Sequence, residues 1–120
     1  MIFILFFSVV DCAIKMVPPE QQYSSISIFA PFQETYKAVK PALMKNGYKI
    51  LARDITVGLV KAKKINRNKF LEIIVKPKSE QESFVNIQLI VEKNGRRLGV
   101  SEKTMAEIET ILDDIKTIVT

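Results

Sequence analysis

The sequence predicts an α+β fold, a two-layer sandwich in which two helices cover one face of an antiparallel sheet. Residues 48–93 contain four consecutive segments in which apolar and polar residues alternate, which is the period of a half-buried strand. One segment before these strands and one after them have apolar residues at spacings of three and four, which is the period of an amphipathic helix. With a first strand near residue 24, the expected order is strand, helix, four strands, helix. Two layers bury the apolar faces of such elements best.

The first two elements are a strand and a helix. "SSISIFA" alternates and forms the first strand, which ends at Pro31. Apolar residues from Phe32 onward recur with helical spacing, and Pro31 suits the start of a helix, where a missing N–H costs nothing. Gly47 suits its end, because glycine tolerates the left-handed conformation found there. Pro41 lies inside the pattern, and since it lacks a backbone N–H we expect it to kink or divide the helix.

The four strands follow, and short turns join them, so we expect neighbours in sequence to be antiparallel neighbours in the sheet. They are, in order, "YKILARD", "GLVKAKKI", "KFLEIIVK" and "FVNIQLIVEK". Ser101 then caps a last helix, because its hydroxyl can accept a free N–H of the first turn. The apolar stripe of this helix consists of Met105, Ile108, Leu112, Ile115 and Val119, with Ile111 and Ile118 beside it.

The N-terminal part of the chain is predicted to lie outside this domain. Its first ten residues form an apolar run that is about half as long as a membrane-spanning helix but matches the apolar region of a secretion signal. Because the only cysteine, Cys12, follows this run, we expect a signal-like leader, residues 1–11, to be removed and the Cys12 thiol to carry a lipid. A different secretory or membrane-tethered arrangement, a leader that starts further upstream, and an extra buried strand are the alternatives. The Pro-Pro pair and polar residues of 12–23 indicate a tether, which leaves 24–120 as one domain.

The composition favours binding over catalysis. The chain has no histidine, which removes the commonest general base, the commonest metal ligand and every Ser-His or Cys-His pair. Its four glycines form no phosphate-binding motif. We therefore expect no catalytic residue, no metal and no cofactor. The net charge of +5 permits an anionic partner, but the absence of a nucleic-acid-binding motif and the signal-like leader argue against nucleic acid.

The last two strands predict a partner-binding surface on the sheet face that points away from the helices. One set of alternate residues is uniformly apolar and should face the helices, because a slip of one residue would bury charged side chains such as Glu72. The other set places apolar residues on the open face, with two lysines at their rim. The alternatives are isolated surface residues without a role, and lysines that only protect a sheet edge. The predicted partner-binding residues are Phe70, Ile74, Phe84 and Ile90, with Lys69 and Lys76.

A resemblance to a known family rests on the piece "FAPFQETYKAVKPALMKNGYKILARDITVGLVKAKK". It contains a helix, a Gly-aromatic exit, a strand and an Asp-x-x-x-Gly turn into another strand. With the acylatable cysteine and the tether, it resembles the helix-grip domains of small bacterial envelope lipoproteins, the C lipoprotein of the outer-membrane β-barrel assembly machinery among them. The resemblance covers residues 24–120 in topology and transfers no catalytic or binding motif.

The resemblance implies a non-enzymatic envelope lipoprotein whose domain binds another envelope protein. Its lipid anchor would hold it at the outer membrane facing the periplasm, and Ala13 after the cysteine fits that destination. The alternative is a carrier, in which an apolar cleft between sheet and helix holds a lipid or another small ligand. A pocket lined by Tyr36 and Met44 would favour the carrier, and a filled core would favour the protein-binding scaffold.

Overall fold

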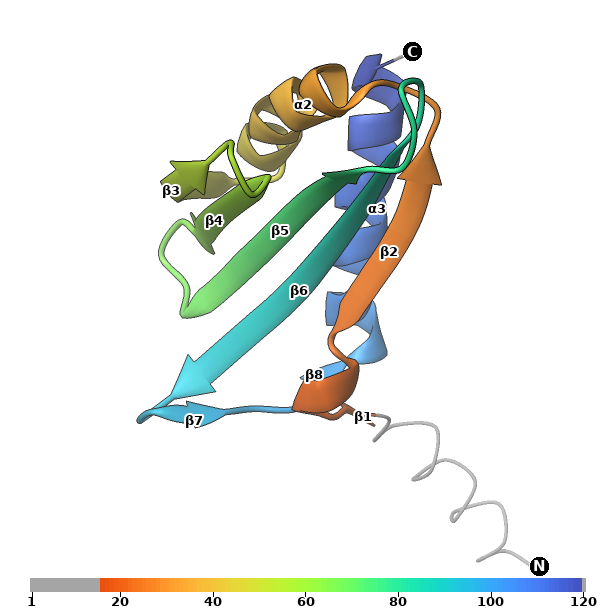
Figure 1. The fold of residues 1–120 in the computed structure, drawn as a ribbon. Helices are drawn as coiled ribbons and strands as arrows, with labels where there is room; N and C mark the ends of the chain where they lie inside the picture. The colour runs from red at the N-terminus through yellow and green to blue at the C-terminus, as the bar shows by residue number, and fades with distance from the viewer. Residues whose placement is uncertain (1–15, 120) are drawn as a thin grey trace, which may run out of the picture.

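The computed structural model describes residues 16–119, in which one antiparallel sheet carries two helices (Figure 1). The predicted order of strand, helix, four strands and helix is confirmed, with short additional strands at one end. Each neighbouring pair in the sheet is antiparallel. The strands follow one another across the sheet as β2 (Tyr23–Ile28), β6 (Ser83–Lys93), β5 (Lys69–Pro77), β4 (Leu59–Lys64) and β3 (Tyr48–Asp54).

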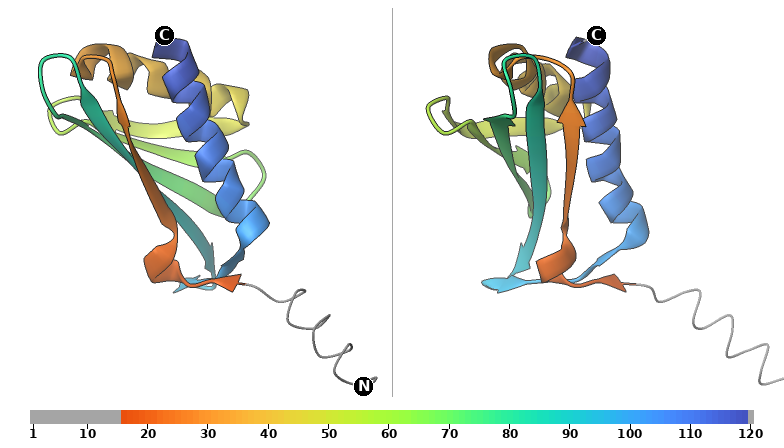
Figure 2. Two further views of the ribbon diagram at one scale, coloured as in Figure 1. Left: turned by 90° about the vertical axis from the view of Figure 1, so that its right-hand side faces the viewer. Right: turned by 45° about the vertical axis from the view of Figure 1, so that its right-hand side comes forward.

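Both helices, α2 (Phe32–Lys45) and α3 (Glu102–Val119), cover the same sheet face (Figure 2). α2 lies over β3 and β5, and α3 lies over β2 and β6. The Tyr36 hydroxyl donates a hydrogen bond to the Leu59 carbonyl (3.1 Å), which fixes α2 above the β3–β4 hairpin. The opposite sheet face carries no helix among the described residues.

The ends of the helices follow the sequence prediction, but the interior of α2 does not. The Ser101 hydroxyl accepts a hydrogen bond from the Thr104 backbone N–H (3.2 Å) and caps α3. At the end of α2, Gly47 has φ +81°. Of the two predicted effects of Pro41, division of the helix is wrong, because α2 runs through Pro41 as one element. The kink stays a prediction. Pro41 is exposed, so water can reach the carbonyl that its missing N–H leaves free.

The core lies between the helices and the apolar sides of the central strands. Leu71 pairs with Leu89, and Ile73 pairs with Ile87, in the β5–β6 register. The side chains of these pairs are at most 1% exposed, which confirms that this set faces the helices. From α3, the fully buried residues are Ile108, Ile111, Leu112 and Ile115. A register shifted by one residue would place Glu72 in this core.

The segment before β2 packs against the domain. β1 (Met16–Val17) pairs with β8 (Val100–Ser101), and a 3₁₀ turn, η1 (Pro19–Gln21), leads into β2. β6 also pairs with the short β7 (Arg96–Arg97). The prediction of a tether over residues 12–23 is therefore wrong from residue 16 onward. The leader 1–11 and the proposed lipidation site Cys12 lie outside the described residues.

Gln22 explains why this segment is ordered. Its side chain is completely buried, and its amide group donates hydrogen bonds to the carbonyls of Val17 (3.0 Å) and Leu98 (2.7 Å). Its amide oxygen accepts a longer hydrogen bond from the Arg97 guanidinium (3.4 Å). A buried amide is stable only with such partners, so Gln22 joins three separate backbone segments.

Candidate functional site

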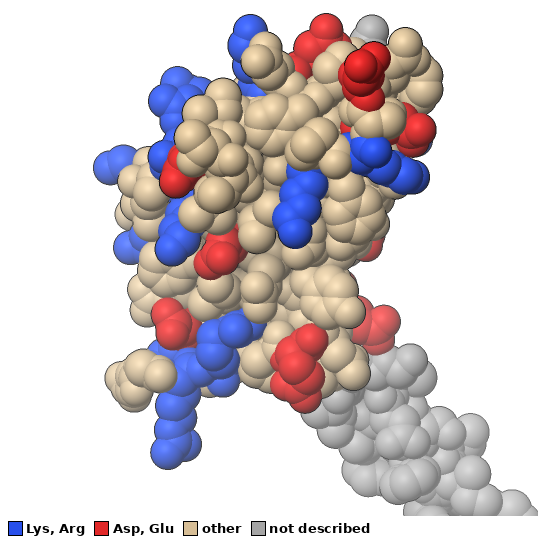
Figure 3. All heavy atoms as spheres, viewed as in Figure 1, with Lys and Arg blue, Asp and Glu red and all other residues tan. Residues whose placement is uncertain are grey.

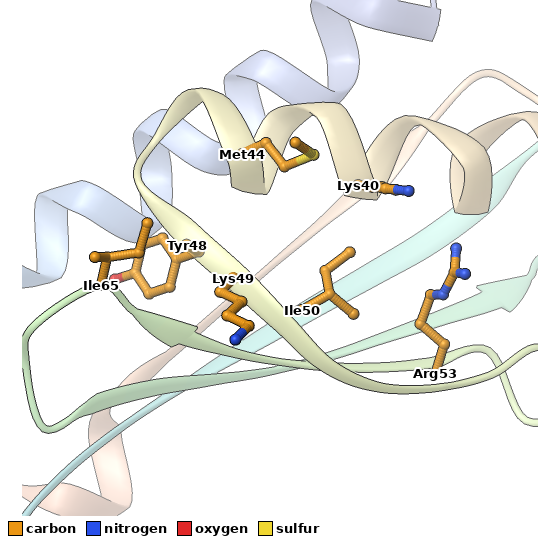
Figure 4. Close-up of a pocket in the computed structure, with 7 residues that line it drawn as sticks. All are labelled: Lys40, Met44, Tyr48, Lys49, Ile50, Arg53 and Ile65. Atoms are coloured by element: carbon orange, nitrogen blue, oxygen red, sulfur yellow. The ribbon is translucent and has the colours of Figure 1, made fainter.

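A groove runs along the edge of the domain, with α2 on one side and β3 on the other (Figure 4). It consists of two adjoining hollows of about 480 and 330 Å³, which share Lys40, Ile50 and Arg53. The larger one falls in the usual size range of small-ligand pockets, about 300–1,000 Å³. Its further lining residues are Met44, Tyr48, Lys49 and Ile65, and those of the smaller one are Tyr36, Lys37, Ile55 and Val60.

The two ends of the larger hollow differ in chemistry. Figure 4 shows Tyr48 and Ile65 at one end and Lys40 and Arg53 at the other. Between them lie the apolar side chains of Met44 and Ile50, and a third cation, Lys49, lies beside Tyr48. The side chains of Lys40 and Arg53 extend toward the same part of the groove. An apolar floor with two cations at one end can hold a molecule that is itself apolar at one end and anionic at the other.

A β-bulge in β3 brings Arg53 to the groove. The register shifts between Ile50, which pairs with Ala62, and Ala52, which pairs with Lys61. Leu51 is the extra residue of the bulge, and after it the side chains alternate between the two sheet faces in the inverted order. Ile50 and Arg53 therefore both point toward the helices. In a regular strand, residues three apart point to opposite faces. Strict period-2 alternation therefore places Arg53 on the wrong face, and the sequence pattern does not predict this site.

The cations of the groove have no acidic partner within residues 16–119. No Asp or Glu lines either hollow, and neither Lys40 nor Arg53 forms an ion pair with a described residue. Lys45 differs, since it pairs with Asp114 (3.3 Å) on α3. A hydrogen bond from Asn46, helped by Lys45, holds the pKa of Asp114 below its usual value.

Tyr48 joins the groove to a polar cluster beneath it. Its hydroxyl lies 3.5 Å from a Glu107 carboxylate oxygen, and the Lys64 ammonium lies 4.9 Å from its ring centroid. Burial raises the pKa of Tyr48, and the Glu107 carboxylate raises it further. The phenol therefore stays protonated, and Tyr48 forms an apolar wall of the groove and not a base.

Lys69 belongs to the same polar cluster, so its predicted role at the rim of the open sheet face is wrong. Its ammonium lies 2.9 Å from the Glu107 carboxylate, and its side chain is only 17% exposed. Lys69 has the same phase in β5 as Leu71 and therefore faces the helices. It cannot line the rim of the open face as predicted.

The other five predicted partner-binding residues lie on the open sheet face, but they do not form one patch. Phe70 pairs with Ile90 in the register. Ile74 lies diagonal to Phe84, whose direct partner is Lys76. The polar pair Glu72 and Gln88 lies between the two apolar pairs. Beside the Phe70–Ile90 pair is a hollow of about 180 Å³, which the bulge residue Leu51 also lines. Figure 3 shows this face, with many Lys and Arg side chains on the side of β3 and β4.

Within residues 16–119, no group of three or more acidic or cysteine side chains could hold a metal ion. No described helix is both long and apolar enough to cross a membrane.

No protein-family model matches the chain, and no curated protein matches it in sequence. Solved structures show a similar fold. The protein XoxI from Bacillus cereus has a TM-score of 0.53 at 12% identity, over 81% of this chain and 90% of that one. The di-domain ARO/CYC StfQ from the steffimycin biosynthetic pathway has a TM-score of 0.51 at 10% identity, over 81% of this chain and 44% of that one. These similarities support a helix-grip-like α+β fold, and neither links the chain to the C lipoprotein of the outer-membrane assembly machinery.

Proposed function

We propose that this protein is a non-enzymatic binding protein that carries an amphipathic small molecule, such as a lipid, in the α2–β3 groove. One observation carries the proposal: the groove combines an apolar floor with cations that have no acidic partner in the described chain. Tyr36 and Met44 line different hollows of the groove and do not share the single pocket predicted for a carrier, and the core between sheet and helices is filled, as predicted for a scaffold. The proposal of a carrier therefore rests on the groove at the edge of the sheet and not on a cleft beneath the helices. Among the groove residues, lysine, arginine and a protonated tyrosine suit binding better than proton transfer.

Titration with an uncharged fluorescent probe, N-phenyl-1-naphthylamine, tests this carrier function. The probe should fluoresce in the groove, and Met44→Glu should weaken its binding because a carboxylate then interrupts the apolar floor. Met44 is 61% exposed, so the substitution should leave the fold intact. The matched control is Val57→Glu, at a position that is 58% exposed in the β3–β4 turn and lines neither hollow. Equal binding by both variants would contradict the groove as the site.

For the location of the protein, the proposal remains an envelope lipoprotein with its anchor at Cys12, at the outer membrane facing the periplasm. β1 begins at Met16, only four residues after the cysteine. Four residues can span at most about 14 Å, so the anchor would hold the β1–β8 end of the domain near the membrane surface. Mass spectrometry of the protein from its native membrane should find residues 1–11 absent and Cys12 acylated. Cys12→Ser should release the protein into the soluble envelope fraction, and an uncleaved Cys12→Ser protein that stays in the membrane would contradict this anchor.

A second candidate function is protein docking on the open sheet face, with another envelope protein as the partner. The observation that favours it is the Phe70–Ile90 pair, two half-buried apolar side chains beside a hollow. Phe70→Ser combined with Ile74→Ser should weaken partner capture from an envelope extract and change thermal stability little. The control is the single variant Tyr23→Ser, on the same face but 56% exposed and opposite Gln88. Unchanged capture, or a large loss of stability, would contradict this candidate.

A further inference from the structure

We infer that the ligand of the groove is an amphiphile with a single apolar chain and an anionic headgroup, and that Lys40 and Arg53 hold the headgroup. This inference rests on the proposed carrier function and adds the chemical class of the ligand. It is carried by the position of the two cations, because both line both hollows and so mark the point where the hollows join.

Electrostatics makes this point a site for an anion. Lys40 comes from α2 and Arg53 from β3, and the two side chains extend toward the same part of the groove (Figure 4). Like charges held in one groove repel each other, and an anion between them removes that repulsion. The same helix shows the contrast, since Lys45, one turn further on, is paired with Asp114. An arginine is especially suited to carboxylate and phosphate groups, because its guanidinium can donate two parallel hydrogen bonds to them.

The apolar part of the ligand has its place in the larger hollow. From the two cations, this hollow leads past Met44 and Ile50 to Ile65 and the ring of Tyr48, with Lys49 beside that ring. Met44 and Ile65 are 61% and 58% exposed in the described chain, so a ligand that covers them removes apolar surface from water. Methionine adapts its shape to different chains, which suits a site that takes an unbranched alkyl group.

The decisive comparison uses three ligands with the same alkyl chain and different headgroups: dodecanoate, dodecyl phosphate and uncharged dodecanol. Each displaces N-phenyl-1-naphthylamine from the protein at about pH 8, where the carboxylate is ionised. At least one of the two anionic ligands should displace the probe at a concentration about tenfold or more below that of dodecanol, the usual effect of a charge-assisted hydrogen bond. The anionic ligand that binds more tightly identifies the headgroup.

Two double variants with the same change in net charge separate the effect of Lys40 and Arg53 from the effect of the protein's net charge. Lys40→Gln with Arg53→Gln should abolish the preference for the anionic ligands over dodecanol. Lys103→Gln with Lys116→Gln, both exposed on α3, should keep the preference. A preference that disappears equally in both double variants would mean that net charge, and not the pair Lys40 and Arg53, selects the ligand.

The outcomes distinguish this inference from the carrier function on which it rests. If the probe does not bind the wild-type protein, the carrier function itself is wrong. If the probe binds and dodecanol displaces it as well as the anionic ligands do, the carrier function stands and the anionic headgroup is wrong. If Lys40 and Arg53 are needed to sediment with phosphatidylglycerol vesicles while neither anionic ligand displaces the probe, the two cations serve a membrane surface and the inference is wrong.

Discussion

Replacing Gln22 with methionine removes three hydrogen bonds and keeps the size and shape of the side chain. The carbonyls of Val17 and Leu98 then lose their amide donor, while the Arg97 guanidinium keeps the carbonyls of Pro19 and Leu89 as acceptors. A buried carbonyl without a donor costs about 1–3 kcal/mol, and because both carbonyls are only partly buried we take the lower half of that range, about 1–2 kcal/mol, for each of the two. The free energy of unfolding should therefore fall by about 2–4 kcal/mol.

Thermal unfolding followed by circular dichroism measures this change. In a domain of about 100 residues, 1 kcal/mol corresponds to about 4 °C or more, so the Tm of Gln22→Met should fall by about 8 °C or more. The control is Gln21→Met, at an exposed position in the adjacent η1 turn, which should shift the Tm by less than about 2 °C. Equal Tm values for the two variants would refute the packing of residues 16–22 and restore the tether predicted from the sequence.

Three further variants test the core, a buried phenol and a tight turn. Leu112→Ala removes three buried carbons and should lower the free energy of unfolding, measured by chemical denaturation, by about 2–5 kcal/mol. Ile118→Ala, on the exposed side of α3, should lower it by less than about 1 kcal/mol, and equal losses would mean that α3 is not docked. Because the pKa of Tyr48 is raised in the folded state, the unfolded phenol ionises first, and the free energy of unfolding should fall as the pH rises above about 10. Tyr48→Phe should lessen this fall, whereas Tyr23→Phe on the surface should not. Gly58→Ala should lower the free energy of unfolding by about 2 kcal/mol or more, because φ is +71° and the added Cβ would overlap the Val75 carbonyl oxygen of β5. A decrease below about 0.5 kcal/mol would contradict this turn.

The parts of the fold that were predictable from the sequence depend on local patterns. The alternation in β5 and β6 fixes their register, since only one phase keeps Glu72 out of the core. The Ser101 cap and the apolar stripe of α3 are read from spacing alone. These features depend on residues a few positions apart, and the sequence contains that information directly.

The features that the sequence analysis missed depend on contacts between distant residues. Gln22 follows two prolines and two polar residues, a composition typical of a linker. Two of the three partners that make its burial favourable, Arg97 and Leu98, lie 75 and 76 residues away. The Lys69 side chain follows the phase of its strand and reaches Glu107 on α3, whereas the sequence predicted it at the rim of the open face. Arg53 needs the bulge at Leu51, which no residue in β3 signals clearly. The groove therefore could not be predicted, although α2 and β3, which form it, could.

The position of β2 in the sheet has a consequence for how the chain folds as it is made. β2 leaves the ribosome before all other strands of the main sheet, but the strand it pairs with, β6, is made much later, and Ser25 and its partner Asn86 are 61 residues apart. The hairpins of β3, β4, β5 and β6 close over short distances and can form without β2. Ile28, which is 1% exposed in the finished domain, therefore has no sheet partner until the hairpins are complete. Because such long-range pairing slows folding, the capture of β2 should be the slow step. Until it occurs, the edge of β6 that β2 will cover stays open to pairing with another chain.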